Sequence, residues 1–362
     1  MSVLFEPLAL RSVQLANRIV VSPMCQYSAE QGFANDWHLV HLGSRAIGGA
    51  GLVICEATAV APEGRISAED LGLWSDEHIA PLHKITQFIE QQGSVAGVQL
   101  GHAGRKASVF PPWLNRTGLR TEAEGGWQPL APSAIAFSPQ HVTPTALNKT
   151  AITQVIEQFA AAAHRAYQAG FKVVEIHAAH GYLLHQFLSP LSNQREDEYG
   201  GSFENRIRLT CEVVQAVRAV WPEDLPLWVR LSATDWLEGG WSLEDTIALA
   251  QCLKPMGVDV LDISSGGTSA TAQIPVGPGY QTGFAAQVKS AADMTVGTVG
   301  LISEPMQAEH ILRTGQADLI LLGRELLRDP YWPLRAAEKL GDRAVAWPAQ
   351  YVRAAHRDTP IR

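Results

Sequence analysis

The chain has few cysteines and none of the short patterns through which cysteine binds a metal or a cluster. The four cysteines, Cys25, Cys55, Cys211 and Cys252, lie far apart without C-x-x-C spacing. A local zinc knuckle or iron–sulfur motif is therefore excluded, and reduced thiols in the cytoplasm are expected. The start, MSVLFEPLAL, lacks the features of a signal peptide, and no apolar run approaches the roughly 20 residues of a membrane span.

Positive charge is also scarce. The 362 residues have a formal net charge of −8, and no run of Lys and Arg is present. We therefore expect no nucleic-acid or membrane partner and a small-molecule substrate instead. A G-x-G-x-x-G turn is missing as well, which argues against a doubly wound dinucleotide-binding sheet.

Short β-branched runs alternate with amphipathic stretches of helical length. The runs lie at residues 18–22, 51–56, 95–100, 173–177, 227–231, 258–263, 295–299 and 319–322. The helix-like stretches lie at 38–48, 77–92, 151–169, 205–220, 243–255, 283–292, 304–314 and 325–340. Helix-stopping glycines follow several of them, at Gly93, Gly170, Gly257 and Gly315. Eight such pairs predict an α/β fold of the (β/α)₈ TIM-barrel type, as a single domain over residues 1–362.

Two segments fall outside this repeat. Residues 4–16 are typical of a short hairpin, which we expect to cap the barrel floor. Residues 102–149, after the third strand, contain six prolines together with Trp113 and Trp127. A connection of this length is usually functional or disordered, so we expect a lid or rim over the barrel mouth.

Polar residues and glycines follow the predicted strands. In strand order they are Ser22–Cys25 with Tyr27; Glu56–Thr58; Gln99, His102, Arg105 and Lys106; His177, His180 and Tyr182; Arg230; Ser264–Gly267; Gly297–Gly300; and Gly323 with Arg324. Barrel enzymes build their active sites at the carboxyl ends of the strands. The sequence therefore predicts one site at this end.

The fourth strand delivers two imidazoles and a phenol within six residues. His177, His180 and Tyr182 could donate hydrogen bonds to a substrate oxygen and a proton to a neighbouring carbon. A loop without a function is the plain alternative. A metal-dependent hydrolase or aldolase is another, with His177 and His180 joined by His185 or His102 as ligands.

Later strands carry groups suited to an anion. Gly297, Gly300, Gly323 and Arg324 favour a phosphate site, although glycines also occur in tight turns without a ligand. Arg230, on a central strand, needs an anionic partner. That partner could be a reduced flavin, or Glu175 or Asp262 in a structural salt bridge.

Two residues on earlier strands suit the same flavin. Gln99 can both donate to and accept from the pyrimidine edge of the ring. Cys25 could tune the redox potential, although a buried cysteine is most often a small hydrophobic residue.

Six motifs then carry a family resemblance over nearly the whole chain. They are SPMCQY at 22–27, EATAV at 56–60, QLGHAGRKA at 99–107, HAAHGYLLHQFLSP at 177–190, NQREDEYGGSFENR at 193–206 and LLGRELLRDP at 321–330. The chain resembles the Old Yellow Enzyme family, and more narrowly its thermophilic-like subgroup, which includes enzymes of the xenobiotic reductase A type.

The resemblance implies an NADPH dehydrogenase or ene-reductase with non-covalent FMN. NADPH or NADH would reduce the FMN, which would pass a hydride to the β-carbon of an activated alkene such as an α,β-unsaturated carbonyl or a nitro compound. It implies that FMN is lined by Ser22, Pro23, Met24, Cys25, Ala57, Gln99, Arg230, Gly323 and Arg324, with Gly300 at the phosphate and Lys106 near by. Tyr27, His177 and His180 would meet the substrate, Tyr182 would protonate it, and Cys25 would modulate the flavin.

The C-terminal tail, residues 345–362, resembles a segment through which one subunit of the subgroup reaches its neighbour's site. Arg353 is the candidate residue for that contact, and the resemblance implies a homodimer or homotetramer. A solvated terminal arginine is the alternative.

Overall fold

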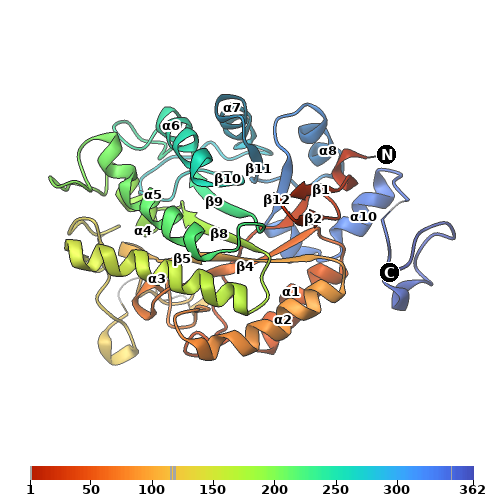
Figure 1. Ribbon diagram of the computed structural model, residues 1–362, viewed down its shortest axis with the longest axis horizontal. Helices are drawn as coiled ribbons and strands as arrows, with labels where there is room; N and C mark the ends of the chain where they lie inside the picture. Colours follow the sequence, from red (N-terminus) through yellow and green to blue (C-terminus); the bar gives the residue numbers. More distant parts are fainter. Residues whose placement is uncertain (1, 115, 117–119, 344) are drawn as a thin grey trace.

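Eight parallel strands form a closed barrel in the computed structural model, which describes residues 2–114, 116, 120–343 and 345–362. In chain order they are β3 (Ile19–Val21), β4 (Leu52–Ala59), β5 (Val95–Gly101), β8 (Val173–Ala178), β9 (Leu227–Ser232), β10 (Val260–Ser264), β11 (Thr295–Thr298) and β12 (Leu319–Leu322). Pairing of β12 with β3, in register from Ile320 and Ile19, closes the ring. The predicted TIM barrel is confirmed (Figure 1).

Helices follow the strands and form the outer layer (Figure 1). They are α1 (Asp36–Ile47), α2 (Ile79–Gln91), α3 (Lys149–Gln168), α5 (Phe203–Val220), α6 (Leu243–Leu253), α7 (Thr282–Ala292), α8 (Pro305–Arg313) and α10 (Trp332–Lys339). The predicted stop glycines Gly93, Gly170, Gly257 and Gly315 all have left-handed backbone conformations. Their positive φ angles let the chain turn from each helix toward the next strand.

Two helical segments differ from the prediction. The single helix expected at 325–340 is wrong, because the chain forms α9 (Arg324–Arg328) and then α10. Pro330 lies between them and cannot donate a helical hydrogen bond. Helix α4 (Leu183–Leu188) was not expected. All six of its residues are buried, so no polar face marks it as a helix in the sequence.

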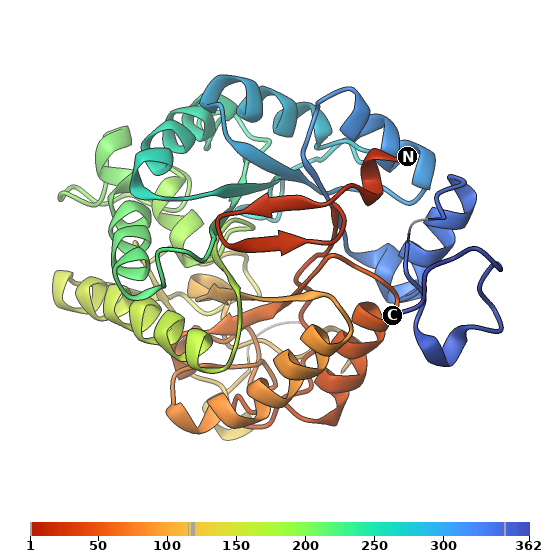
Figure 2. The ribbon, with the colours of Figure 1, turned by 45° about the vertical axis from the view of Figure 1, so that its right-hand side comes forward.

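The amino end of the barrel is covered by the predicted hairpin, β1 (Leu8–Leu10) and β2 (Val13–Leu15). Figure 2 shows these two strands lying across the barrel. The Ser12 N–H donates to the Asp224 carbonyl at 3.0 Å, and Arg11 Nε lies 2.7 Å from an Asp259 carboxylate oxygen. Asp259 immediately precedes β10 and Asp224 lies shortly before β9, so the hairpin is fastened to the barrel floor.

The long connection between β5 and α3 lies at the opposite end, as predicted. It includes two short strands, β6 (Leu130–Ala131) and β7 (Thr145–Ala146). The rings of Trp113 and Tyr27 pack edge to face, with their centres 5.6 Å apart. Lys106 Nζ lies 4.6 Å from the centre of the Phe137 ring. These contacts make the connection a rim beside the carboxyl ends of the strands.

The C-terminal tail folds against the outside of the barrel. The Trp347 N–H donates to the Pro360 carbonyl at 2.8 Å, and Arg362 Nη2 donates to the Ile47 carbonyl at 2.7 Å. Figure 1 shows this tail beyond α10, on the side of the N-terminal hairpin. Arg353 is exposed there. Among the described residues, no helix is long and apolar enough to cross a membrane.

Candidate active site

A cavity of about 420 Å³ opens at the carboxyl ends of β9 to β12. It is lined by four of the predicted cofactor residues, Arg230, Gly300, Gly323 and Arg324. The lining also includes residues that the sequence did not single out, among them Tyr280, Gln281, Ser303 and Arg328. Tyr280, Gln281 and Ser303 lie in loops without a recognisable motif, so only the fold reveals them, whereas Arg328 ends α9 within the motif at 321–330.

At Gly300 the cavity is lined by backbone atoms, because this residue has no side chain. Its φ angle is +131°, and a Cβ placed there would lie 2.9 Å from the Tyr280 ring. Gln281 fixes the neighbouring turn by donating from Nε2 to the Val299 carbonyl at 2.7 Å. With the guanidinium of Arg324 also lining the space, the geometry suits a phosphate group.

Arg230 lies at the inner wall of the cavity. Its Nε is 2.8 Å from Asp262 Oδ2, and its Nη2 donates to Ser22 Oγ at 3.3 Å. The structural ion pair considered from the sequence is therefore real. It does not use the whole guanidinium, because Arg230 also lines the cavity and an arginine has five N–H donors. The residue can thus meet a second anion.

Gln99 lies deeper in the barrel, on β5. Its Nε2 donates to Glu175 Oε1 at 2.7 Å, and both side chains are almost completely buried. Because this contact uses the amide nitrogen, it fixes the orientation of the amide group. The sequence identified Gln99, but it suggested Glu175 only as a possible salt-bridge partner of Arg230 and not as the carboxylate that orients this amide.

The segment from Ser22 to Tyr27 is held by an irregularity in β4. The register between β4 and β5 shifts between Cys55 and Ala57, at Glu56. The Gln26 N–H donates to Glu56 Oε2 at 2.8 Å, and His38 Nε2 lies 3.3 Å from Glu56 Oε1. Glu56 thus supports the segment that carries Pro23, Met24 and Cys25, a role that strand periodicity could not reveal.

Cys25 is held as a neutral thiol. Burial, together with the nearby carboxyl groups of Asp70 and Glu56, raises its pKa well above the usual value. A thiolate nucleophile is not what this environment favours. Met24, beside it, brings its sulfur to 3.7 Å from the position a Cβ of Gly323 would take, so the segments after β3 and β12 are close neighbours.

His177, His180 and Tyr182 come together as predicted. The ring centres of His177 and His180 are 5.2 Å apart, and those of His177 and Tyr182 are 4.9 Å apart. Burial, followed by the charge of Arg230, lowers the pKa of both histidines well below the usual value. Both imidazoles are therefore neutral at pH 7.

The hydrogen bonds of the two rings differ. The Ala179 N–H donates to His177 Nδ1 at 3.3 Å, which leaves Nε2 of His177 as the protonated, donating nitrogen. His180 Nε2 contacts Ser264 Oγ at 2.7 Å, and its backbone N–H donates to Ser232 Oγ at 2.9 Å. His180 is therefore anchored by hydroxyl groups from β9 and β10.

Tyr182 is held as a neutral phenol above the same site. Burial is the main cause that raises its pKa well above 10. Lys106 Nζ lies 5.1 Å from its ring centre and donates to the carbonyls of His180 and Gly267 at 2.9 and 3.1 Å. Lys106, which the resemblance placed near the FMN, thus connects the loop after β8, which carries His180, to the loop after β10, which carries Gly267.

These two loops touch through their backbones. A Cβ on Gly267 would lie 2.5 Å from the Cα of His180, and Gly267 has a φ of +96°. His180 itself has a φ of +57°, an uncommon conformation for a residue with a side chain. Only glycine at position 267 allows this close approach.

The remaining histidines do not complete a metal site. His185 is fully buried, with Nε2 3.1 Å from Asp235 Oδ1, and its Nδ1 accepts the Gly181 N–H at 2.9 Å. His102 Nδ1 accepts the Gly104 N–H at 3.0 Å. Within the part of the chain that the structure describes, no group of three or more His, Cys, Asp or Glu residues could hold a metal ion. His185 and His102 are engaged in these contacts, and His185 positions the turn before Tyr182.

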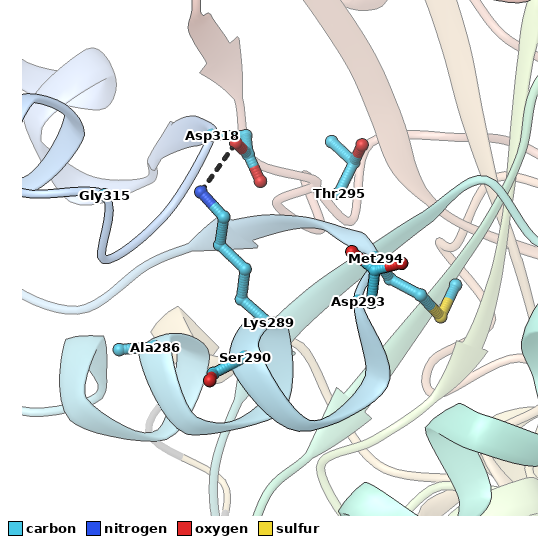
Figure 3. Close-up of a pocket in the computed structure, with 8 residues that line it drawn as sticks. All are labelled: Ala286, Lys289, Ser290, Asp293, Met294, Thr295, Gly315 and Asp318. Carbon is cyan, nitrogen blue, oxygen red and sulfur yellow. Dashed lines mark hydrogen bonds and ion pairs between the residues drawn. The ribbon is translucent and has the colours of Figure 1, made fainter.

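A second cavity, of about 480 Å³, lies at the amino ends of β11 and β12. Figure 3 shows its Lys289 directed at Asp318, with Nζ 2.8 Å from a carboxylate oxygen. Its other carboxylate, Asp293, lies 2.9 Å from Lys254 Nζ. Since these charges pair with each other or with neighbours, the site at the carboxyl ends remains the candidate active site.

Comparisons with known proteins agree with this geometry. Residues 3–343 match the model of the NADH:flavin oxidoreductase / NADH oxidase family. The NADPH dehydrogenase of Bacillus subtilis (strain 168) is 49% identical over 352 residues, which are 97% of this chain and 98% of that protein.

Two solved structures resemble the fold. Morphinone reductase has a TM-score of 0.79 at 30% identity, over 94% of this chain and 90% of its own. The Old Yellow Enzyme homologue from Zymomonas mobilis has a TM-score of 0.77 at 28% identity, over 93% and 92%. This chain belongs to the NADH:flavin oxidoreductase / NADH oxidase family and is an FMN- and NAD(P)H-dependent oxidoreductase of the Old Yellow Enzyme type.

Proposed function

We propose that this enzyme is an ene-reductase, which uses NADPH or NADH to reduce the double bond of an activated alkene. The observation that carries the proposal is the group of two neutral imidazoles and a neutral phenol, with ring centres 4.9 to 5.2 Å apart. Such a group can hold and protonate a substrate. It has no evident purpose in a protein that only binds flavin.

The cofactor residues fit FMN in two parts. The cavity with Gly300, Gly323 and Arg324 suits the phosphate, and Arg230 suits the anionic edge of the ring. Gln99 and the segment Ser22–Cys25, with Ala57 beside it, complete the ring site in this proposal. FMN held by these residues would supply the redox chemistry, which is hydride transfer from the nicotinamide to the β-carbon of the alkene.

The histidines bind the substrate carbonyl or nitro oxygen. Nε2–H of His177 can donate, and the ring of His180 is anchored by Ser264 beside it. Hydrogen bonds to this oxygen withdraw electron density from the β-carbon and stabilise the negative charge that develops. Because both rings are neutral, they polarise the oxygen without first giving it a proton. Tyr27, packed on Trp113 of the rim, borders the substrate on the other side.

Tyr182 gives its proton to the α-carbon. Its raised pKa keeps the phenol protonated until the strongly basic carbon of an enolate forms. Cys25, a neutral thiol in this structure, adjusts the flavin environment and takes no part in bond formation.

The Tyr182→Phe variant tests the mechanism, because it removes the O–H and preserves the ring. We expect the oxidative half-reaction with 2-cyclohexenone to slow by about 10²- to 10⁴-fold, the usual contribution of general acid catalysis. Reduction of the enzyme by NADPH should keep its rate. Stopped-flow absorbance measures both halves separately.

Tyr27→Phe is the matched control, since it removes another phenol from the same site. It should leave proton transfer intact. An equal loss in both half-reactions of Tyr182→Phe would contradict the donor role. A folded protein that is purified colourless and does not bind added FMN would contradict the whole proposal.

The tail supports a further part of this proposal, in which Arg353 enters the active site of a second copy. Arg353 is exposed and lies outside the lining of its own chain's cavity. Arg353→Ala should then raise the KM for the alkene without changing FMN binding, and size-exclusion chromatography should show a dimer or tetramer. A monomer with an unchanged KM would contradict this part.

A further inference from the structure

A layer of buried polar side chains that includes Arg230 crosses the barrel interior. It consists of Gln99, Glu175, Arg230 and Asp262, which come from the successive strands β5, β8, β9 and β10. Their exposed fractions are 2%, 0%, 5% and 0%. Ionised side chains are rarely enclosed to this degree without compensation, so the layer needs a physical explanation.

The charges within the layer do not balance. Arg230 is the single cation, and it forms its ion pair with Asp262 at 2.8 Å. Glu175 accepts a hydrogen bond from the uncharged amide of Gln99. Among the described residues, Glu175 Oε2 and Asp262 Oδ1 have no hydrogen-bond partner. If both carboxyl groups were ionised, the layer would bury one uncompensated negative charge.

A proton resolves this imbalance. Burial, and then the charge of Asp262, raise the pKa of Glu175 to about 8, while burial raises that of Asp262 to about 6 despite the opposing effect of Arg230. The groups that face Glu175 are Arg230 on β9, Asp262 on β10 and the amide of Gln99 on β5. At neutral pH the pair therefore carries one proton, which falls to Glu175 because Arg230 forms its ion pair with Asp262.

We propose that Glu175 and Asp262 form a shared proton site whose occupancy is linked to the redox state of the bound flavin. The link is Arg230, because the same guanidinium contacts Asp262 and lines the cofactor cavity. This inference rests on the proposed position of FMN against Arg230.

Hydride transfer from the reduced nicotinamide brings two electrons and one proton, so the cofactor gains one negative charge. That charge engages Arg230 and weakens its compensation of the carboxyl pair. Where the pair is unprotonated, it takes one proton from solvent. When the alkene accepts the hydride, the cofactor loses the charge and the pair returns the proton to solvent.

The proposal has a direct electrochemical consequence. For a two-electron couple, each proton taken up lowers the midpoint potential by about 30 mV per pH unit. Below the pH at which the oxidised enzyme loses the shared proton, one proton is taken up and the slope is about 30 mV. Above that pH, two protons are taken up and the slope rises to about 60 mV.

Spectroelectrochemical titration of the FMN-loaded enzyme from pH 6 to pH 10 tests this slope. The wild type should show the steeper slope in the alkaline part of the range. Glu175→Gln should remove the steeper segment and keep about 30 mV throughout, because glutamine can still accept the hydrogen bond of Gln99 but cannot hold the proton. Asp293→Asn, an exposed carboxylate at the amino end, is the matched control and should behave like the wild type.

Infrared difference spectra of the wild type provide a second measurement that needs no variant. Reduction at alkaline pH should produce the carbonyl stretch of a protonated carboxylic acid. A constant slope in the wild type, a steep segment that persists in Glu175→Gln, or the absence of this infrared band would overturn the proposal. Failure to bind FMN would instead overturn the proposed function, so the two failures are distinguishable.

Discussion

The two ends of this barrel differ in how their charged side chains are paired and buried. At the amino end, charged side chains pair with each other near the surface, as Lys289 does with Asp318 and Arg11 with Asp259. In the barrel interior beside the carboxyl-end cavity, Arg230, Asp262 and Glu175 are buried, and atoms of both carboxyl groups lack a hydrogen-bond partner among the described residues.

This contrast shows which end is built for a ligand. Burying a polar group without a partner costs about 1–3 kcal/mol, and more for a charge. A fold tolerates this cost where a ligand or a proton completes the interactions. The cavities at the two ends have similar volumes, about 420 and 480 Å³, so cavity size does not distinguish them. The burial and pairing of the charged side chains distinguish the two ends.

The strongest test of the comparison removes the cation at the carboxyl end. Arg230→Met leaves Asp262 buried without its partner, and we expect a loss of about 3–5 kcal/mol in the free energy of unfolding of the apo-protein. FMN binding should weaken by more than about 100-fold, since an ionic contact is lost in a buried site. Urea unfolding and FMN fluorescence titration measure the two effects.

The double variant with Asp262→Asn as well is the matched control. It should regain much of the lost stability but none of the FMN affinity. If Arg230→Met bound FMN as tightly as the wild type, the carboxyl end would lose its assigned role.

The second test uses pH. Burial raises the pKa of Glu175 to about 8, so we expect it to stay protonated in the folded apo-protein at pH values where an unfolded glutamate, with its ordinary pKa of 4.5, has released its proton. Between these values the folded state binds more protons than the unfolded state, so stability falls as pH rises. The expected slope is roughly 1 kcal/mol per pH unit from this group.

Urea unfolding of the apo-protein at several pH values from 5 to 8 measures the slope. The difference between the wild type and Glu175→Gln isolates the contribution of this residue from that of all other groups. Parallel curves for the two proteins would show that Glu175 is ionised throughout this range.

A smaller loss in the free energy of unfolding is expected from changes at Glu56, which supports the segment that carries Cys25. Glu56→Ala removes the acceptor of the Gln26 N–H and the partner of His38, and should cost about 2 kcal/mol. Hydrogen exchange at the Gln26 amide should speed up. Glu56→Gln retains an acceptor and is the control. Unchanged exchange in the alanine variant would mean that the segment is held by other contacts.

The smallest effect is expected at the amino end. Lys289→Met breaks the pair with Asp318, whose partners include the Val296 N–H, at 2.9 Å. Because both side chains are partly solvated, the free energy of unfolding should change by less than about 1 kcal/mol. FMN binding should not change. A loss as large as that of Arg230→Met would remove the distinction between the two ends.

The sequence predicted the barrel because local signals repeat along the chain. Eight apolar runs lie between amphipathic stretches, and glycines such as Gly93 and Gly170 mark the turns. Local signals fail where burial is uniform, as in α4, or where a proline divides a pattern, as Pro330 does between α9 and α10.

The candidate site was predictable where a motif follows a strand. His177, His180 and Tyr182 are within six residues and come together as expected. Apart from Arg230 with Asp262, pairs between distant residues could not be predicted from the sequence, because only the closed barrel brings them together. His185 with Asp235 and Glu56 with His38 are such pairs.

The backbone contact between His180 and Gly267 limits where this enzyme can change its substrate range. Any side chain at position 267 would displace the backbone of His180, the residue that we propose binds the substrate oxygen, so variation there is expected to abolish turnover before it alters selectivity. Tyr27 and Trp113 meet side chain to side chain at the rim, where different ring sizes can be exchanged. Directed evolution toward bulkier alkenes should therefore accumulate its useful mutations at this aromatic border and leave the glycine untouched.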